Sequence, residues 1–102
     1  MAITMPVKDG MPATHPGEFL KELLEEFKIS QVGLADALGV SNMRVSHVIR
    51  GQRPITAELA LRLGRVIGQT PQYWLNLQTT YDLKIAQRDN QAGLYALRPL
   101  AA

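Results

Sequence analysis

Residues 31–50 read QVGLADALGVSNMRVSHVIR, and this stretch decides the fold. It holds two short runs in which apolar residues recur at three- and four-residue spacings, a pattern typical of helices. Gly39 separates the two runs, and glycine readily adopts the left-handed backbone that turns a chain sharply after a helix. Ala35 is small enough to let the two helices cross closely. The stretch therefore predicts a helix-turn-helix unit, in which the second helix can enter the major groove of DNA.

The second helix of this unit is expected to run from Ser41 to about Arg50, and its two faces differ in character. Its apolar side, formed by Val45, Val48 and Ile49, is expected to be buried against the rest of the domain. With that side anchored inward, the polar residues between these positions face outward or sideways. They are the residues that could contact DNA.

The rest of the chain is also predicted to be helical. Apolar residues recur at helical spacing almost throughout, and no segment shows the sustained alternation of a strand. We expect three further helices: one that begins near Pro16, one between the cap Thr56 and Gly68, and one from the cap Thr70 to about Asp89. The predicted fold is an all-α, five-helix domain.

The length of the chain bounds its organisation. With 102 residues, of which 46% are apolar, it can form one compact domain and is too short for two. We assign residues 15–89 to a helix-turn-helix domain whose last helix serves packing and dimerisation. Residues 1–14 and 90–102 have weak periodicity and contain Gly and Pro, so both are expected to be flexible. Because a domain this small buries a limited share of its surface, a homodimer is expected.

The composition argues against several classes of protein. There is no cysteine, which excludes disulfides and Cys-based zinc sites, and His15 and His47 are isolated, so we predict no metal and no cofactor. No apolar stretch approaches the length of a membrane span and no secretion signal is recognisable, so a cytoplasmic protein without a membrane partner is expected. No nucleophile–base pair, carboxylate dyad or phosphate-binding loop can be assembled, and the chain is predicted not to be an enzyme.

Charge is distributed unevenly along the sequence. The whole chain carries only +2, but residues 1–39 carry −3, and residues 40–65, with five arginines and one glutamate, carry +4. Arginine presents a planar fork of donors that suits phosphate and the guanine edge. A solvated basic helix face explains the same charge equally well, so charge alone does not decide the function.

Three further blocks of sequence carry a resemblance to a known family. Gln31, Ala35, Gly39 and Val45 have the spacing of lambda-repressor-like, or Xre, helix-turn-helix proteins. The blocks HPGEFL (15–20), GQRPITAELALRL (51–63) and YWLNLQTTYDL (73–83) resemble the HigA branch of antitoxins, so the similarity spans roughly residues 15–86. The resemblance implies the antitoxin of a type II HigB/HigA system. Such an antitoxin neutralises a HigB-type, RelE-like mRNA-cleaving toxin and represses its own toxin-antitoxin operon.

The resemblance also implies DNA contacts for individual residues. It places Asn42, Met43 and His47 where Xre-family recognition helices touch base edges, with Arg44 beside them. Their chemistry is compatible with that role, because Asn pairs with adenine, Arg with guanine, and Met packs on the thymine methyl group. The predicted phosphate contacts are Gln31, Ser41, Gln52, Arg53 and Thr56.

Two other functions remain open at this point. The chain could be a stand-alone Xre-type transcriptional repressor without a toxin partner, and a neighbouring gene for a small basic protein would separate this from an antitoxin. It could also be a protein-interaction module that uses the fold only as a scaffold, because a fold does not prove a function. Binding to its own promoter tests this last alternative.

Two groups of side chains outside the unit are expected to be structural. His15 precedes a proline at a helix entry, where a local capping or packing role is more common than a functional one. Tyr73, Trp74 and Leu77 have the spacing of a core patch. The helix that carries them is also expected to supply the subunit interface.

Overall fold

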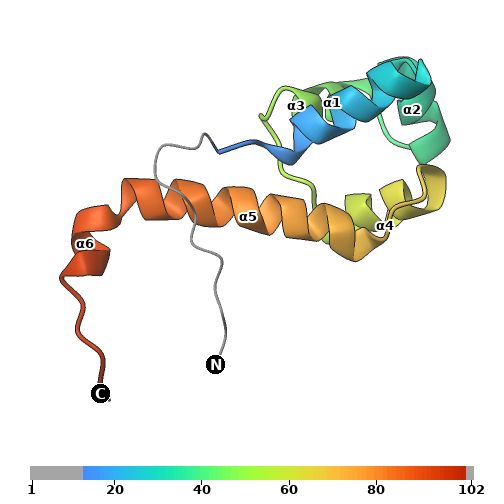
Figure 1. Cartoon of the computed structure of the whole chain (residues 1–102). Coiled ribbons are helices and arrows are strands. Elements are labelled where there is room, and N and C mark those ends of the chain that lie inside the picture. Colours follow the sequence, from blue (N-terminus) through green and yellow to red (C-terminus); the bar gives the residue numbers. More distant parts are fainter. Residues whose placement is uncertain (1–12, 101–102) are drawn as a thin grey trace.

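The structure is a computed structural model that describes residues 13–100 of the chain, and every regular element in that range is a helix, as predicted (Figure 1). The helices are α1 (Pro16–Phe27), α2 (Gln31–Leu38), α3 (Asn42–Ile49), α4 (Ala57–Val66), α5 (Pro71–Asp89) and α6 (Gln91–Tyr95). The first five correspond to the expected helices, and α6 was not expected. Residues 1–12 and 101–102 lie outside the described range, and the flexibility of 1–14 and 90–102 stays a prediction.

Local sequence determines where four of these helices begin. The hydroxyl groups of Ser30, Ser41, Thr56 and Thr70 each accept a hydrogen bond from the backbone N–H three residues later, at 2.9–3.2 Å. Each bond satisfies one of the donors that a helix N-terminus leaves without an intrahelical partner. At the other end of α2, Gly39 adopts φ 71°, the left-handed conformation that the turn requires. The positions of the helix-turn-helix elements thus follow from short-range chemistry.

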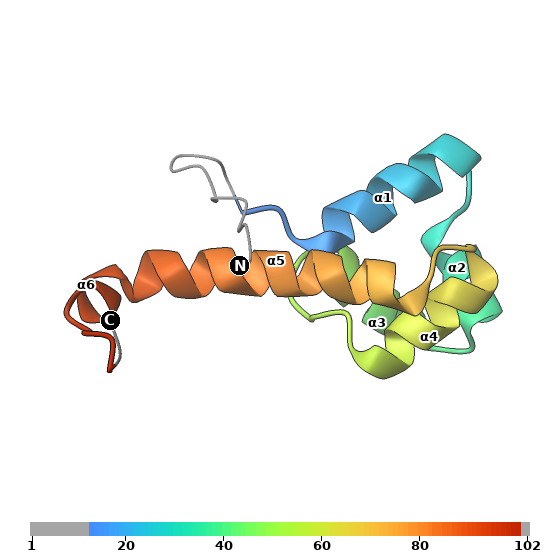
Figure 2. The ribbon, with the colours of Figure 1, turned by 60° about the horizontal axis from the view of Figure 1, so that its bottom comes forward.

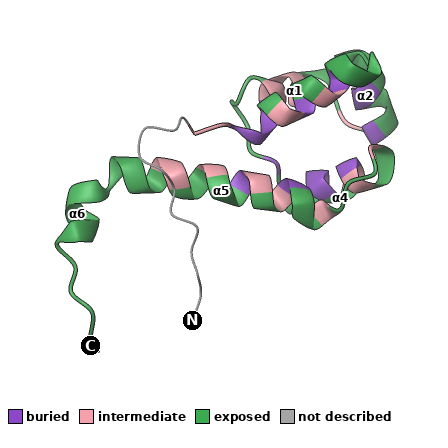
Figure 3. Cartoon of the chain, viewed as in Figure 1, coloured by how far each residue is buried: buried purple, intermediate pink, exposed green. Residues whose placement is uncertain are grey.

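Helices α1 to α4 and the first half of α5 enclose one apolar core. The purple segments of Figure 3 mark this core on the facing sides of the helices. Burying one such leucine, valine or isoleucine side chain contributes about 1.5–3 kcal/mol to stability. The fully buried apolar residues are Leu20, Leu24, Leu34, Ala35, Leu38, Val45, Val48, Ile55, Leu59, Ala60, Leu63 and Trp74.

The aromatic pair at the start of α5 corrects one prediction. Trp74 is fully buried and Leu77 packs against the core, as expected, but Tyr73 is 36% exposed. Consecutive helical residues point about 100° apart, so Tyr73 and Trp74 cannot both face the core. Tyr73 instead meets the edge of the Trp74 ring, with the ring centroids 5.2 Å apart and the planes at 86°.

Helix α5 is the longest element and projects from the packed body, as Figures 1 and 2 both show. Its 19 residues span about 28 Å. Its first half carries the two buried side chains of the helix, Trp74 and Gln78, whereas every residue from Ala86 to Leu100 is exposed. The molecule measures 52 × 25 × 22 Å as a result. Within residues 13–100, no helix is both long enough and apolar enough to cross a membrane.

Candidate nucleic-acid interface

Helix α3 has the two faces that its sequence predicted. Val45 and Val48 are buried in the core, whereas Asn42 is exposed and Met43 is 66% exposed. His47 is half-buried at the edge of the exposed face. Three of the four predicted base-contacting residues therefore lie on or beside the solvent-exposed face of α3.

Helix α3 is seated unusually close to the start of α1. Gly17, in the first turn of α1, is buried, and a Cβ atom at this position would overlap the carbonyl oxygen of Val48. Only glycine allows the two backbones to approach so closely. This role of Gly17 was not predicted, and the sequence signal for it is a glycine inside a predicted first helical turn. This contact fixes the depth at which α3 lies in the domain.

The predicted phosphate contacts lie at helix starts and in the link between α3 and α4. Gln31 is the first residue of α2, and Ser41 and Thr56 cap α3 and α4. Gln52 and Arg53 are exposed, and their backbone N–H groups donate to the His47 carbonyl oxygen at 2.8 and 3.2 Å. This folds the link back onto the end of α3. All five predicted contacts are exposed residues.

Arg44 differs from the other predicted base-contacting residues. Its Nη2 donates to Glu58 Oε1 at 3.1 Å and to Thr56 Oγ1 at 3.4 Å, so the side chain crosses from α3 to the start of α4. Only 24% of the side chain is exposed. This ion pair with Glu58 was not predicted from the sequence. A base contact by Arg44 remains a prediction.

A buried amide holds the link between α3 and α4 from behind. Gln78 of α5 is buried, and its Oε1 accepts a hydrogen bond from the Ile55 N–H at 2.8 Å. Its Nε2 donates to Asp82 Oδ1 at 2.9 Å. Gln78 was not among the predicted functional residues, although a polar residue four positions after the core residue Trp74 lies on the same helix face. This one side chain fixes the backbone that leads from Arg53 to the start of α4.

His15 closes the same junction from the other side. Its Nδ1 accepts a hydrogen bond from the Gly17 N–H at 2.9 Å, which confirms the expected capping role, and its ring meets Tyr81 edge-on at 4.9 Å. Burial lowers the pKa of His15, while Asp82, a hydrogen bond with the Arg53 backbone and Glu18 act in the opposite direction. The imidazole therefore belongs to the scaffold behind the predicted DNA-facing surface.

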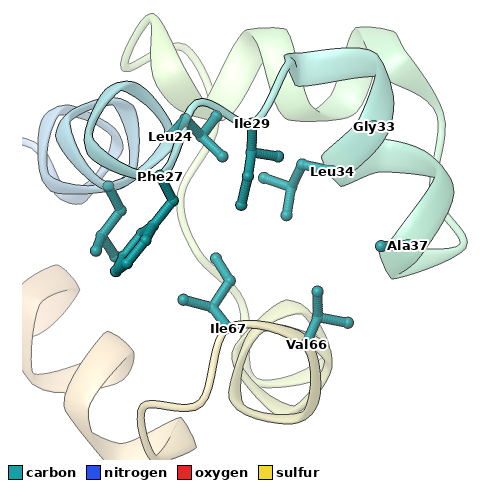
Figure 4. Close-up of a pocket in the computed structure, with 9 residues that line it drawn as sticks. Leu24, Phe27, Ile29, Gly33, Leu34, Ala37, Val66 and Ile67 are labelled. Atoms are coloured by element: carbon teal, nitrogen blue, oxygen red, sulfur yellow. The ribbon is translucent and has the colours of Figure 1, made fainter.

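An apolar pocket of about 260 Å³ lies away from this surface, between α1, α2 and the end of α4 (Figure 4). No lining residue belongs to α3 or to the link that follows it, so the pocket is separate from the predicted DNA contacts. No group of three His, Asp or Glu residues in the described part of the chain could hold a metal ion. The pocket is lined by Leu23, Leu24, Phe27, Ile29, Gly33, Leu34, Ala37, Val66 and Ile67.

Comparison with known proteins finds a matching family, similar sequences and similar solved structures. The helix-turn-helix family (HTH_3) matches residues 20–74, more than half of the chain. Virulence-associated protein I of Dichelobacter nodosus is 51% identical over 86 residues, which cover 83% of this chain and 80% of the relative. Antitoxin HigA-1 of Vibrio cholerae is 39% identical over 85 residues, which cover 82% of this chain and 80% of that protein. The structure of Pseudomonas aeruginosa antitoxin HigA with the higBA promoter matches with a TM-score of 0.83 and 43% identity, covering 87% of this chain and 99% of that one.

Proposed function

Because this chain belongs to the HigA branch of the helix-turn-helix family, we propose that it is an antitoxin that binds its own operator and represses its toxin-antitoxin operon. The observation that carries the proposal is the exposed side of α3. It presents Asn42 and Met43 on a helix whose opposite side is locked into the core. A helix held in this way can enter the major groove without rearranging the domain.

The surroundings of α3 suit the DNA backbone. The start of α2, at Gln31, and the link with Gln52 and Arg53 flank the exposed side of α3 in sequence, and residues 40–65 carry a net charge of +4. Backbone N–H groups at helix starts and exposed arginines both bind phosphate. We assign base contacts to Asn42, Met43, Arg44 and His47. Gln31, Ser41, Gln52, Arg53 and Thr56 are assigned to phosphates.

The operator complex is proposed to contain a homodimer. Two recognition helices about 34 Å apart would meet successive major grooves of a palindromic site. The exposed second half of α5, with α6, offers apolar surface for this contact, including Leu83, Leu94 and Tyr95, which are 57%, 49% and 75% exposed. Burying such side chains against a second copy is favourable. The same protein is proposed to neutralise a RelE-like mRNA-cleaving toxin, to have no enzymatic activity and to act in the cytoplasm, where its operator lies.

Binding of the purified protein to the promoter of its own gene tests the DNA-binding function. A mobility-shift titration at low salt should give a shift with this promoter at concentrations that leave a scrambled duplex unbound. Asn42→Ala should weaken binding to the promoter by about five- to a hundredfold, if the amide makes a bidentate contact with adenine. Absence of any shift, for the protein alone and with its toxin, would exclude the proposal.

The phosphate contacts make a separate prediction. Arg53→Ala should weaken binding to every duplex and reduce the slope of log K against log salt concentration by about one unit. Lys21→Ala is the matched control, because it removes a positive charge from an exposed position of α1, outside both the predicted DNA contacts and the proposed dimer contact. Equal slopes for the wild type and Arg53→Ala would remove Arg53 from the phosphate contacts.

Co-expression tests the antitoxin function. If a gene for a small basic protein lies beside this one, its expression alone should arrest growth, and co-expression of this chain should restore growth. Rescue by a variant with weakened DNA binding, such as Asn42→Ala, would show that neutralisation of the toxin does not depend on repression of the operon. DNA binding without such a neighbour, or without rescue, would support the stand-alone repressor instead.

A further inference from the structure

Glu58, in the first turn of α4, is bonded by two arginines, one at each of its carboxylate oxygens. Arg44 of α3 donates to its Oε1 at 3.1 Å, and Arg62 of α4 donates to its Oε2 at 3.2 Å. Arg62 is itself anchored, because its Nη1 donates to the Leu38 carbonyl oxygen at the end of α2, at 2.8 Å. A continuous chain of bonds therefore runs from the turn of the helix-turn-helix unit, through α4, to the side of α3.

The bonds leave part of the Arg44 guanidinium available. Both of its bonds, to Glu58 and to Thr56, use the same nitrogen, Nη2. Nε and Nη1 remain for an acceptor outside the described part of the chain. These two nitrogens lie on different edges of the guanidinium and do not form a parallel fork, but Nη1 has two N–H donors of its own and can donate to a guanine acceptor such as N7 or O6.

The effect of this arrangement on folding stability is small, because exposed ion pairs contribute little. Its effect on Arg44 is larger. A free arginine side chain samples many rotamers, and ordering it on binding costs conformational entropy. Glu58 orders it beforehand, and the hydrogen bonds from Arg44 and then Arg62 lower the pKa of Glu58, which favours its charged form.

We propose that Glu58 is a positioning residue for DNA recognition, which fixes Arg44 so that it discriminates between bases. The carboxylate restrains the guanidinium from turning to the nearest DNA phosphate. Its own negative charge also repels the phosphates of a DNA site that does not offer Arg44 the correct base. Glu58 thus lowers affinity for arbitrary DNA and raises selectivity for the operator. This inference rests on the DNA-binding function proposed above.

The test compares the wild type with Glu58→Ala on three kinds of duplex: the operator, a set of single-base operator variants and a random sequence. Glu58→Ala should bind the random duplex more tightly, with a salt slope steeper by about one unit as Arg44 becomes a phosphate contact. The ratio of operator to random affinity should fall by about fivefold or more. The preference at one base pair should disappear, and the preferences that depend on Asn42 should persist.

Three further variants make the test specific. In an Arg44→Ala background, adding Glu58→Ala should leave the base preferences unchanged, because the restrained side chain is absent. Glu22→Ala, which removes an exposed negative charge from α1, should change affinity for all duplexes equally. Glu58→Gln keeps an acceptor oxygen without the charge, and should change selectivity in the same direction even if Glu58→Ala folds poorly.

The outcomes separate this inference from the function on which it rests. If the wild type does not bind its promoter, the DNA-binding function fails. If the wild type binds and Glu58→Ala keeps the same operator-to-random ratio, or acts equally with and without Arg44, only the role of Glu58 is overturned.

Discussion

At the scale of single residues, the predicted DNA-facing surface depends on side chains that do not face DNA. His15 and Gln78 lie behind the link between α3 and α4, and both are buried. His15 accepts a hydrogen bond from the Gly17 N–H, and Gln78 accepts one from the Ile55 N–H. Neither N–H has an acceptor within a helix. A buried N–H without an acceptor costs free energy, so these two side chains stabilise the fold while they set the path of the link.

The burial of His15 predicts a pH dependence of stability. Burial lowers the pKa of His15 from 6.5, so below that pH the unfolded chain binds more protons than the folded one. Its contribution to the free energy of unfolding is present above 6.5 and is lost as the pH falls through the lowered pKa. His15→Asn keeps a capping acceptor but does not titrate. Denaturation by urea at about pH 7.5 and 5.5 should show a larger loss for the wild type than for this variant, since only the wild type loses a neutral buried imidazole. Equal losses would contradict the prediction.

The hydrogen bond between Gln78 and Ile55 is expected to contribute measurably to the free energy of unfolding. Gln78→Leu leaves the Ile55 N–H without its acceptor, and the free energy of unfolding should fall by about 1–3 kcal/mol. Gln72→Leu is the matched control, because Gln72 lies on the exposed side of the same helix and should change stability by less than about 0.5 kcal/mol. Equal effects of the two substitutions would mean that the bond to Ile55 does not stabilise the link.

At the scale of helices, the crossing of α1 and α3 decides where the recognition helix lies. The close approach at Gly17 leaves no room for a side chain, so α1 acts as a support for the backbone of α3 at Val48. Helices usually cross at larger distances, with side chains between them. The position of α3 is therefore set by backbone contact and is insensitive to side-chain packing at this point.

Gly17→Ala should move or destabilise this contact. The added methyl group meets backbone atoms, which cannot turn away as a flexible side chain can, and the free energy of unfolding should fall by about 1–3 kcal/mol or more. Gly93→Ala in α6 is the control, since a Cβ there meets nothing within 4 Å. It should leave stability unchanged or raise it slightly through helix propensity. Thermal melts followed by circular dichroism measure both, and a Gly17→Ala melt like that of the wild type would contradict the close approach.

Helices α1 to α5 could be predicted from the sequence, whereas α6 and the polar contacts between helices could not. Ser41 and Gly39 act on residues within four positions, so their roles were readable from spacing. Arg44 and Glu58 are 14 positions apart, and Ile55 and Gln78 are 23 apart. Whether such pairs meet depends on the angles at which helices cross, and these angles follow from the packing of the whole core.

At the scale of the whole molecule, the shape is that of a compact body with a projecting arm, the second half of α5 together with α6 (Figures 1 and 2). An isolated helix of this length is marginal in water unless its apolar side is covered. The exposed apolar residues of the arm are consistent with a second copy that covers it.

Leu83→Lys should therefore dissociate the proposed dimer. A lysine that replaces an apolar residue in an interface must either lose hydration or hold the two copies apart. Gln72→Lys adds the same charge at the exposed start of α5, outside the arm, and should leave the assembly intact. Sedimentation velocity at micromolar concentration measures the mass of each variant. A dimeric Leu83→Lys variant would place the interface elsewhere.

The bond between Gln78 and Ile55 joins the packed first half of α5, from which the arm continues, to the link that carries Arg53. In a dimer formed through the arm, the length of α5 then sets the distance between the two recognition helices α3. The position of the interface around the axis of α5 sets their relative rotation. One residue inserted between positions 82 and 83 would turn the outer part of the helix by about 100° and lengthen it by about 1.5 Å. If the proposed dimer forms through the arm, the length of α5 would set the distance between the operator half-sites that the two copies can contact together.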